Sequence, residues 1–587
     1  KAGAQEDRAS YFATQQSMGE FYIDLLMRMD KLDPAAGHNA EAFEAAERER
    51  ARSLLEMLAE SRVDIRQGVD PKLLQREHEI AGLLNSNAQR LLTLRGTGAE
   101  EKAAALKKEI SDLENESQQI ELAIRKSSPQ YSAMTQPQPL TLKEIQQQVL
   151  DSDTVLLEYA LGEERSYLWV VNPGTVSTSG LKSYELPKRS EIEKSVREVV
   201  DLLSARGTYV SSELPQQKKA RIARADARLP QAAARLSQMV LAPAAAELGN
   251  KRLVLVTDGS LQHVPFAMLP VPMPNAASAT TPLVAEHEIV SLPSASTVAE
   301  LRKQIAGREP ALKTIAVLAD PVFQSDDPRV SRQASISKTA IIKKEAVKKD
   351  TASSGSIVSA TKVSSLGNEA QEENSRILVH LAATEADNAS GGQLRVPRLP
   401  FTRQEADRII KLAGEKDSFE ALDFNASLAT ATSAELGRYR YLHFATHGYL
   451  DSEQPELSAI VLALVDKNGQ PQTGFLRAND IYNLKLPADL VVLSACQTGL
   501  GKEIRGEGIV GLTRGFMYAG IPRVIVSLWS VNDRATEELM AAFYQKLLKE
   551  KLTPAAALRQ AQMAMMKDKQ WSAPYYWAAF VQQGEWK

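Results

Sequence analysis

The spacing of apolar side chains changes character near Thr154. Before this point, from about Asp7 to Ala133, apolar residues recur every three or four positions, which is typical of amphipathic helices. Beyond it, short apolar runs of strand length alternate with further helical patterns. The sequence therefore predicts an all-helical first part followed by a longer α/β sandwich.

The first part opens with two expected helices. One is predicted over Asp7–Lys31 and the other over Glu41–Ser61, and Asp33-Pro34 breaks the pattern between them. Two antiparallel amphipathic helices of this size, in a unit of residues 1–65, resemble a terminal tetratricopeptide-type repeat. Because the sequence begins with lysine and not with methionine, we expect a fragment or a processed form that has lost upstream repeats or a signal peptide.

Residues 66–135 show the periodicity of a helical hairpin. Mostly apolar positions from Ile80 to Leu94, and again from Leu106 to Ile124, are spaced alternately by four and three residues. Gly96 and Gly98 lie in the turn between these arms. We expect the arms to pair within the chain as an antiparallel coiled coil, and an oligomerisation zipper is the alternative.

The α/β part consists of two units separated by a segment of different composition. The first unit, residues 150–325, has expected helices over Glu191–Ser204 and Ser296–Ala306. Its strands are expected over Thr154–Ala160, Ser166–Val171, Arg252–Val256, Ile289–Leu292 and Thr314–Leu318. Residues 326–397 are rich in Ser, Ala, Thr and Lys and are expected to form a flexible linker or insertion. The alternation of strands and helices resumes over residues 398–587.

Two segments of the last unit lead to reactive side chains. Tyr441–Gly448 contains His447 near its end, and Asp489–Gly499 reaches Cys496 after a similar apolar run. Each segment places a polar group at the carboxyl end of a buried strand, where open α/β sheets hold their active sites. The 49 positions between the two residues suffice for one strand, a connection and a return to a neighbouring strand. We therefore expect His447 and Cys496 to face each other.

A thiol beside an imidazole suits nucleophilic catalysis. At its ordinary pKa of about 8.5 a thiol is only slightly ionised at neutral pH. A nearby imidazole accepts the thiol proton and later protonates the leaving amine. The backbone N–H groups of Gly448 and Cys496 are the candidate donors to the oxyanion that forms during acyl transfer.

Composition excludes several classes of binding site and partner. Cys496 is the only cysteine, which excludes internal disulfides and cysteine-based metal cages. The formal net charge of −3 gives no basic field for nucleic acid, and no apolar run is long enough for a transmembrane helix. A metal pair of His443 and His447 lacks both a third ligand and an HExxH pattern. We therefore expect no cofactor, and a structural role for His443.

A series of ordered motifs surrounds the two reactive residues. In chain order they are His443-Phe-Ala-Thr-His-Gly448, Leu493-Ser-Ala-Cys-Gln-Thr-Gly499, Gly506-Glu-Gly508, Ser527-Leu-Trp-Ser-Val-Asn-Asp533 and Tyr576-Trp-Ala-Ala-Phe580. Together they closely resemble the CHAT family of caspase-like peptidases, strongly over Leu399–Lys587 and more loosely over Thr154–Asp320. The resemblance implies a caspase-hemoglobinase-like sandwich, in which helices flank a central, mostly parallel sheet.

The resemblance also implies roles for single residues. It places His447 and Cys496 in the dyad positions of a cysteine endopeptidase. The relatedness of the family to separase implies that Asp533 lies in the S1 pocket, where a carboxylate favours arginine or lysine before the scissile bond. The alternative is that Asp533 caps the helix that begins near Arg534.

Bacterial proteins of this resemblance act in defence and programmed cell death, including cleavage of gasdermin-like partners. By resemblance we expect a protein substrate, a regulatory protein bound through the N-terminal helices, and a location in the bacterial cytoplasm. Neither direct nucleic-acid binding nor a membrane span is expected. The alternative is a catalytically silent scaffold that uses a CHAT-like fold and repeats only to bind proteins.

Overall fold

The computed structural model describes most of the chain after residue 138 and part of what precedes it. The described residues are 18–50, 139–174, 180–208, 210, 213–272, 281–330, 396–449, 458–482, 484–494, 502–504, 508–510 and 512–587, with separate residues between 58 and 123. The expected linker over residues 326–397 lies outside this part from residue 331 to 395. No helix among the described residues is long and apolar enough to cross a membrane.

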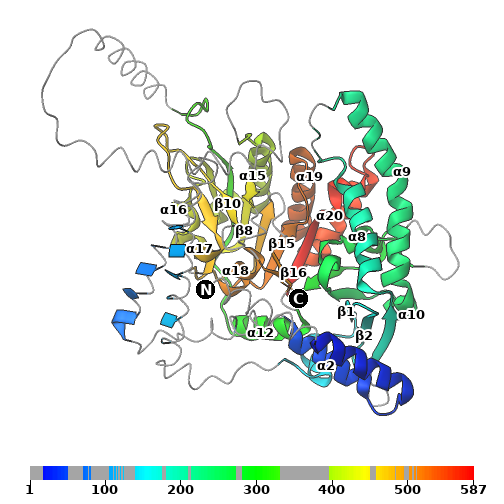
Figure 1. Ribbon diagram of the computed structural model, residues 1–587. Coiled ribbons are helices and arrows are strands. Elements are labelled where there is room, and N and C mark those ends of the chain that lie inside the picture. Colours follow the sequence, from blue (N-terminus) through cyan, green and yellow to red (C-terminus); the bar gives the residue numbers. More distant parts are fainter. Residues whose placement is uncertain are drawn as a thin grey trace, which may run out of the picture.

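One large sheet organises the described part of the α/β region (Figure 1). Its eleven strands follow one another across the sheet in the order β3 (Leu181–Leu186), β2 (Ser166–Val171), β1 (Thr154–Ala160), β4 (Arg252–Val256), β5 (Ile289–Leu292), β16 (Phe580–Gly584), β15 (Arg523–Ser527), β12 (Leu490–Ser494), β8 (Tyr439–Ala445), β6 (Lys313–Pro321) and β7 (Ser418–Asp423). The mixed α/β class with a mostly parallel sheet, predicted from the sequence, is confirmed.

Apart from the antiparallel strands β2 and β3 at one edge, the sheet consists of two parallel halves that run in opposite directions. In the first half β1, β4, β5 and β16 are parallel neighbours. In the second half β15, β12, β8, β6 and β7 are parallel neighbours. The halves meet at the antiparallel pair of β16 and β15. Consequently the carboxyl ends of the first half lie on the same edge of the sheet as the amino ends of the second.

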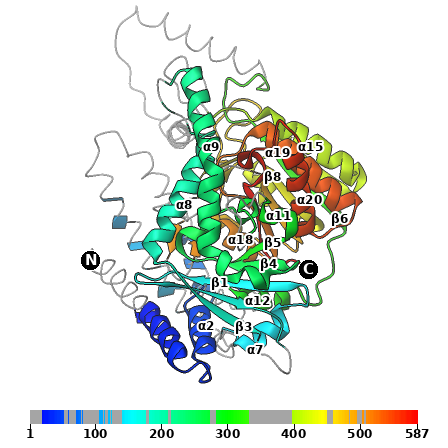
Figure 2. The same cartoon turned by 90° about the vertical axis from the view of Figure 1, so that its right-hand side faces the viewer.

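Most inner strands of the sheet are largely apolar and buried on both faces, whereas the edge strands β3 and β7 are partly exposed. Along β4, Leu253 and Leu255 join the core on one face, while Val254 and Val256 join the core on the other. The first face is covered by α8 (Arg189–Ser204), α9 (Pro215–Val240), α11 (Leu283–Glu286), α15 (Pro400–Ala413), α19 (Asp533–Tyr544), α20 (Pro554–Lys567) and α21 (Pro574–Trp577). Figure 2 shows α8 and α9 running along each other on this face.

The opposite face is covered by shorter helices and by the N-terminal part of the chain. These elements are α2 (His38–Glu49), α12 (Ala295–Ile305), α16 (Leu428–Ala431), α17 (Ala478–Tyr482) and α18 (Leu512–Tyr518). Two small sheets accompany the large one: β9 (His447–Tyr449) with β10 (Ala459–Val461) and β11 (Phe475–Arg477), and β13 (Lys502–Ile504) with β14 (Gly508–Val510). The described α/β part is therefore a three-layer arrangement of helices, sheet and helices.

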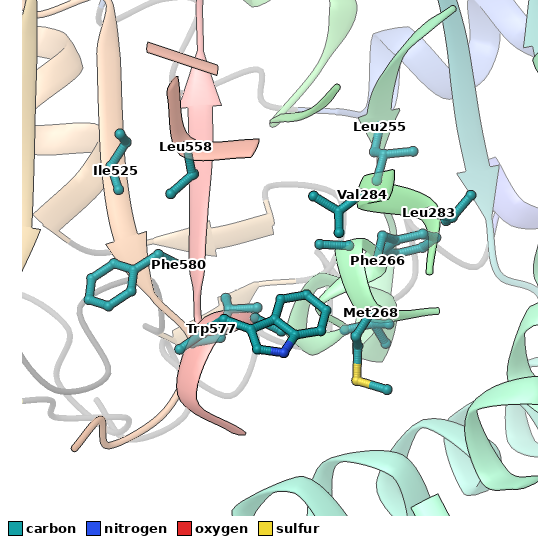
Figure 3. Close-up of a cluster of buried hydrophobic side chains, with 14 of the residues drawn as sticks. Leu255, Phe266, Met268, Leu283, Val284, Ile525, Leu558, Trp577 and Phe580 are labelled. Atoms are coloured by element: carbon teal, nitrogen blue, oxygen red, sulfur yellow. The ribbon is translucent and has the colours of Figure 1, made fainter. Parts of the chain in front are cut away.

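A continuous apolar core joins the two halves of the sheet (Figure 3). Leu255 of β4 and Phe266 contribute from the first half, and Ile525 of β15 and Phe580 of β16 contribute from the second. Trp577 of α21 belongs to the same cluster and is buried. Since burial of each large apolar side chain contributes about 1.5–3 kcal/mol, the halves form one cooperative body.

The predicted elements of the first unit match the structure closely. The strands over Thr154–Ala160, Ser166–Val171, Arg252–Val256 and Ile289–Leu292 have the predicted bounds. The fifth strand, predicted over Thr314–Leu318, extends over Lys313–Pro321. The two predicted helices appear as α8 and α12 with starts shifted by one or two residues.

The helical first part agrees only in part. Residues 18–32 are helical, as predicted. The helix expected over Glu41–Ser61 is interrupted at Arg50, because α2 stops at Glu49 and Arg50 has extended backbone angles. Between residues 51 and 61 only Leu58 is described, and it is helical. Arg50 leaves the helix to place its guanidinium 3.2 Å from the buried Glu158 carboxylate and to bond the Tyr159 carbonyl oxygen.

The predicted helical hairpin is described only at separate positions. Those residues are helical in both arms, and Ile80, Leu106 and Leu113 are buried. Arg76 Nε lies 2.8 Å from Glu116 Oε1, so these positions of the two arms are adjacent. The turn at Gly96 and Gly98 is outside the described residues.

Candidate active site

His447 lies just beyond the carboxyl end of β8. The chain passes directly from β8 into β9, where His447 is paired with Val461 of β10. The preceding Thr446 fixes this step, since its hydroxyl donates to the Val461 carbonyl oxygen at 2.5 Å. The imidazole is buried and packs against the Phe323 ring, with 5.3 Å between ring centroids.

One contact of His447 defines its protonation pattern. Its Nε2 lies 2.7 Å from the backbone carbonyl oxygen of Pro397. A carbonyl oxygen only accepts hydrogen bonds, so Nε2 must carry the proton and donate it. In the neutral ring the basic lone pair is then on Nδ1. The imidazole is therefore oriented as a base that acts through Nδ1.

A buried carboxylate holds the peptide unit that His447 contacts. Arg398, whose amide nitrogen completes the peptide bond of Pro397, makes a bidentate ion pair with Asp320: its Nε is 2.8 Å from Oδ1 and its Nη2 is 2.6 Å from Oδ2. Asp320 is only 1% exposed, and bidentate arginine pairs of this kind are among the strongest side-chain hydrogen bonds. The Pro397 carbonyl is thus tied to the sheet.

Two further arginines complete what we call the Asp320 cluster, which consists of Asp320, Asp423, Arg329, Arg398 and Arg403. Arg329 Nη1 lies 3.1 Å from Asp320 and 2.8 Å from Asp423, and Arg403 bonds both carboxylates. Asp320, the penultimate residue of β6, and Asp423, the last residue of β7, have φ angles of 47° and 56°, a left-handed conformation that aspartate tolerates better than most residues. The cluster fixes two strand ends beside His447.

Cys496 lies outside the described residues, so its side chain is not placed. The strand that leads to it is placed: β12 ends at Ser494, which is paired with Ala445 of β8. His447 follows Ala445 by two residues, and Cys496 follows Ser494 by two residues. Each expected dyad residue thus lies two positions beyond the same pair of facing residues, Ala445 and Ser494.

Of the two expected oxyanion donors, Gly448 is among the described residues. Gly448 is in β9, paired with Ile460 of β10, and is partly exposed. It therefore lies at the open side of the strand end that carries His447. The second donor, the backbone N–H of Cys496, is outside the described residues.

Asp533 is placed beyond β15, the other neighbour of β12. It is the first residue of α19, and its Oδ2 accepts the backbone N–H of Phe401 at 3.1 Å. The N-cap of α19 is Asn532, whose side chain accepts from Ala535 at 3.0 Å. Asp533 thus binds the first turn of α15, while the cap role that the sequence offered as its alternative is filled in α19 by Asn532.

His443 has a different environment from His447. It is fully buried in β8, with Nε2 2.8 Å from Glu405 of α15 and Nδ1 3.0 Å from the Tyr544 hydroxyl of α19. Burial raises the pKa of Tyr544 well above its usual range, so this hydroxyl stays protonated. Both ring nitrogens of His443 are occupied by side chains that tie two helices to the sheet, which supports the structural role predicted for it.

Sequence reasoning missed the residues that support the candidate base. Pro397 and Arg398 lie at the edge of the expected linker, and nothing in their local pattern indicates contact with a histidine 50 positions later. Asp320 follows a strand and precedes proline, which is a visible signal of a polar strand end. The carboxyl edge of the second half therefore gathers His447, the Asp320 cluster and Asp533 around the strand that leads to Cys496.

Residues 230–585 match the sequence model of the CHAT domain. Tetratricopeptide repeat protein 28 from Homo sapiens is 40% identical over 106 residues, which are 18% of this chain and 4% of that protein. The Mus musculus protein of the same name is 39% identical over 106 residues, with the same coverage. This chain therefore spans only a small fraction of the length of these curated relatives.

Two solved structures show a distant likeness. The separase–securin complex of Saccharomyces cerevisiae aligns with a TM-score of 0.43 and 11% identity, over 79% of this chain and 31% of that chain. The complex of the RgpB pro- and mature domains from Porphyromonas gingivalis aligns with a TM-score of 0.29 and 10% identity, over 67% of this chain and 76% of that chain. Scores at this level are too low to decide a fold or a function.

Proposed function

Because this chain belongs to the CHAT domain family, we propose that it is a caspase-like cysteine endopeptidase in which His447 and Cys496 form the catalytic dyad. The observation that carries the proposal is the orientation of His447. Its Nε2–H is fixed on the Pro397 carbonyl at the carboxyl end of β8, and the neighbouring strand β12 leads to Cys496.

Chain connectivity supports the pairing of these residues. Consecutive Cα atoms are 3.8 Å apart, so residue 496 is at most about 7.6 Å from the Cα atom of Ser494. Ser494 is itself paired with Ala445, two residues before His447. These short connections limit how far a thiol at position 496 can lie from the imidazole of His447.

The reaction then follows from the two side chains. Nδ1 of His447 accepts the thiol proton, and the thiolate attacks the carbonyl carbon of the scissile peptide bond. The oxygen that becomes negative is stabilised by the N–H groups of Gly448 and Cys496. The imidazolium gives its proton to the leaving amine, and a thioester forms. Water activated by His447 then hydrolyses the thioester and restores the thiol.

Asp533 gives the proposal a substrate preference. β15 and β8 flank β12 on opposite sides, so Asp533 and His447 lie on either side of the strand that leads to Cys496. A carboxylate in this position favours a basic residue before the scissile bond through charge-assisted hydrogen bonds. We include cleavage after arginine or lysine in the proposed activity.

The N-terminal helices supply the proposed docking surface for a regulatory protein. The helix over residues 18–32 exposes a row of large apolar side chains at helical spacing: Met18, Phe21, Leu25, Met29 and Leu32. Phe21 is 66% exposed and Leu32 is 88% exposed. Exposed apolar rows of this kind mark protein interaction sites. The resemblance adds a gasdermin-like protein as the proposed substrate class, and defence or cell death in bacteria as the setting.

Peptide hydrolysis tests the dyad. The full chain and its Cys496→Ala variant are incubated with a library of peptides that contain arginine or lysine, and the products are identified by mass spectrometry. We expect cleavage by the parent protein and background hydrolysis by the variant. Equal background hydrolysis in both, also with candidate activating proteins present, would favour the alternative of a silent binding scaffold.

A second pair of variants separates the two roles of Asp533. Asp533→Asn removes the charge but keeps an oxygen that accepts the Phe401 N–H, whereas Asp533→Ala removes both. If Asp533 recognises the basic residue, Asp533→Asn lowers kcat/KM for arginine peptides at least about tenfold, since hydrogen bonds to charged groups contribute about 1.5–3 kcal/mol. A variant that loses stability but keeps its preference for arginine would assign Asp533 to the structure alone.

A further inference from the structure

A cavity of about 480 Å³ lies at the opposite edge of the sheet from His447. It is bordered by the amino ends of four strands of the second half: Thr314 in β6, Tyr441 in β8, Asp489 directly before β12, and Arg523 at the start of β15. With about 3.3 Å per residue along β8, roughly 20 Å separate this cavity from His447. It is therefore a separate feature from the candidate active site.

The charges around this cavity are unbalanced. Among the described residues, its lining includes a single carboxylate, that of Asp489, and five basic side chains, those of Arg308, Arg440, Arg523, Lys551 and Lys587. Asp489 is shared, because its Oδ1 lies 3.4 Å from Arg308 and its Oδ2 lies 2.9 Å from Arg440. Lys587 also lies 3.6 Å from Asp151, which is outside the lining.

Burial affects two of the arginines, whose guanidinium groups donate to backbone carbonyl oxygens: Arg308 to Gly520 and Ala488, and Arg523 to Asp489 and Lys587. Burial lowers the pKa of Arg308 more than the nearby Asp489 raises it. Burial likewise lowers the pKa of Arg523, despite the attraction of Glu585 and Asp489. Desolvated cations of this kind gain stability when an anion enters beside them. The cavity therefore favours a negatively charged occupant.

A helix adds to the same field. Thr553 and Pro554, the N-cap and first residue of the 14-residue helix α20, form part of the lining. The first turn of α20 contains no acidic residue. The amino end of a helix carries a partial positive charge, which stabilises phosphate and other anions. The amino end of α20 therefore adds to the attraction of the basic side chains for an anion.

The remaining lining is apolar and indicates the shape of the occupant. Leu547, Leu548 and Leu552 form one wall, and Tyr441 provides an aromatic ring beside the guanidinium of Arg440, 5.3 Å from the ring centroid. The volume is in the range of sites for small organic ligands. Guanidinium groups match phosphate in geometry.

We propose that this cavity binds a small molecule with a phosphate group, in which the phosphate faces the arginines and an organic body packs against the leucines and Tyr441. β8 and β12, which lead to the two proposed dyad residues, begin at the cavity. The bound ligand therefore stabilises the strands that carry the active site. This site does not depend on the proposed peptidase activity.

Binding to the full chain tests this proposal. Isothermal titration at low salt uses three probes: adenosine monophosphate, adenosine as its uncharged counterpart, and inorganic phosphate. We expect the monophosphate to bind and to raise the melting temperature, with an affinity that falls as salt rises. Adenosine that binds as tightly as the monophosphate would overturn the proposal. Inorganic phosphate that binds as tightly would support the anion site and assign it to free phosphate.

Exposed residues provide variants that keep the fold. Arg440→Ala combined with Lys551→Gln leaves Asp489 bonded to Arg308, and we expect it to weaken binding of the monophosphate at least about tenfold. Arg235→Ala is the matched control, since Arg235 of the far helix α9 is similarly exposed and is paired with Glu198 of α8. Absence of binding to the parent chain, or equal binding by the double variant and the parent, would contradict the proposal.

Discussion

Each half of the sheet has a buried carboxylate near the carboxyl end of a strand, and each carboxylate is paired with an arginine. The two ion pairs differ in what they hold in place. In the first half Glu158 of β1 is fully buried and faces Arg50, which comes from the end of α2. In the second half Asp320 of β6 is buried and faces Arg398, which precedes α15. Each arrangement pairs an interior carboxylate with an arginine from a neighbouring segment.

The difference lies in what the arginine positions. Arg50 bonds the carbonyl oxygens of Tyr159 and Thr257, so it closes the strand ends of the first half and fixes the N-terminal helices there. Glu47 of α2 adds to this closure, since its carboxylate accepts from the backbone N–H groups of Ala295 and Ser296 at the start of α12. Arg398 instead holds a carbonyl that orients an imidazole. A buried ion pair thus locks one half and supports chemistry in the other.

The largest expected effect distinguishes the two histidines of β8. His447→Gln keeps a donor toward Pro397 but removes the base, and we expect kcat to fall by about 10²–10⁴. His443→Gln disturbs the bonds to Glu405 and Tyr544, and we expect it to lower the free energy of unfolding by about 1–3 kcal/mol while activity persists below its melting temperature. The kcat and the thermal melting curve of each variant are measured to separate the effect on catalysis from the effect on stability. Loss of turnover in a folded His443→Gln protein would refute this division of roles.

Removal of Arg50 is expected to have the next largest effect. Arg50→Ala leaves the buried Glu158 beside Glu47 without its cation, which costs about 3–5 kcal/mol in the free energy of unfolding at neutral pH. The double variant Arg50→Ala/Glu158→Gln is the control, and it should recover part of this loss because the unpaired carboxylate is gone. Chemical denaturation measures each value. Equal stability of the single and double variants would show that Glu158 is not the group that Arg50 compensates.

The same pair predicts a direction of pH dependence. Burial, together with Glu47, raises the pKa of Glu158 well above its usual range, more than Arg50 lowers it. A raised pKa in the folded state gives stability that is present below the ordinary pKa of glutamate, about 4.3, and that is lost as pH rises through the folded value. Removal of Arg50 raises this pKa further, so we expect the deficit of Arg50→Ala to grow as pH rises through the folded-state pKa of Glu158 in the parent, which lies well above the ordinary value. A deficit independent of pH would contradict this account.

The smallest expected effect concerns the support of the candidate base. Arg398→Ala frees the Pro397 carbonyl but leaves Asp320 bonded to Arg329 and Arg403. We expect kcat to fall about tenfold with little change in KM, since the imidazole is oriented less well. Arg403→Ala, which removes an ion pair of the same cluster six residues from Pro397, is the control. Equal losses of kcat in both variants would assign the effect to the cluster as a whole.

Apolar patterning predicted the sheet well because most of its inner strands are buried on both faces. Thr154–Ala160, which is mostly apolar apart from Glu158, and Arg252–Val256 have clear ends, so their bounds follow from the sequence. The end of α2 did not follow, because the helical pattern continues past Glu49 and only a tertiary ion pair with Glu158 draws Arg50 out of it. Local periodicity contains no information on a carboxylate more than one hundred residues away.

The candidate site was likewise predictable from the sequence only in part. His447 and the strand before Cys496 were predictable, since each is a polar residue that follows a buried run. The support of His447 was not, because Pro397 and Arg398 meet Asp320 and His447 only through the three-dimensional arrangement of β6, β8 and α15. The ion pairs of Asp320 with three arginines likewise have no signature in the sequence, because Arg329, Arg398 and Arg403 approach it only in the folded chain.

The reactivity of the single thiol tests the central claim most directly, because Cys496 is the only cysteine and no substrate is needed. The rate of alkylation by iodoacetamide at pH 7 is measured by intact mass for the folded parent protein and for His447→Gln. If the imidazole takes up the thiol proton, the parent reacts at least about tenfold faster than the variant, and the difference disappears when both are unfolded. Equal rates in the two folded proteins would contradict a His447–Cys496 dyad.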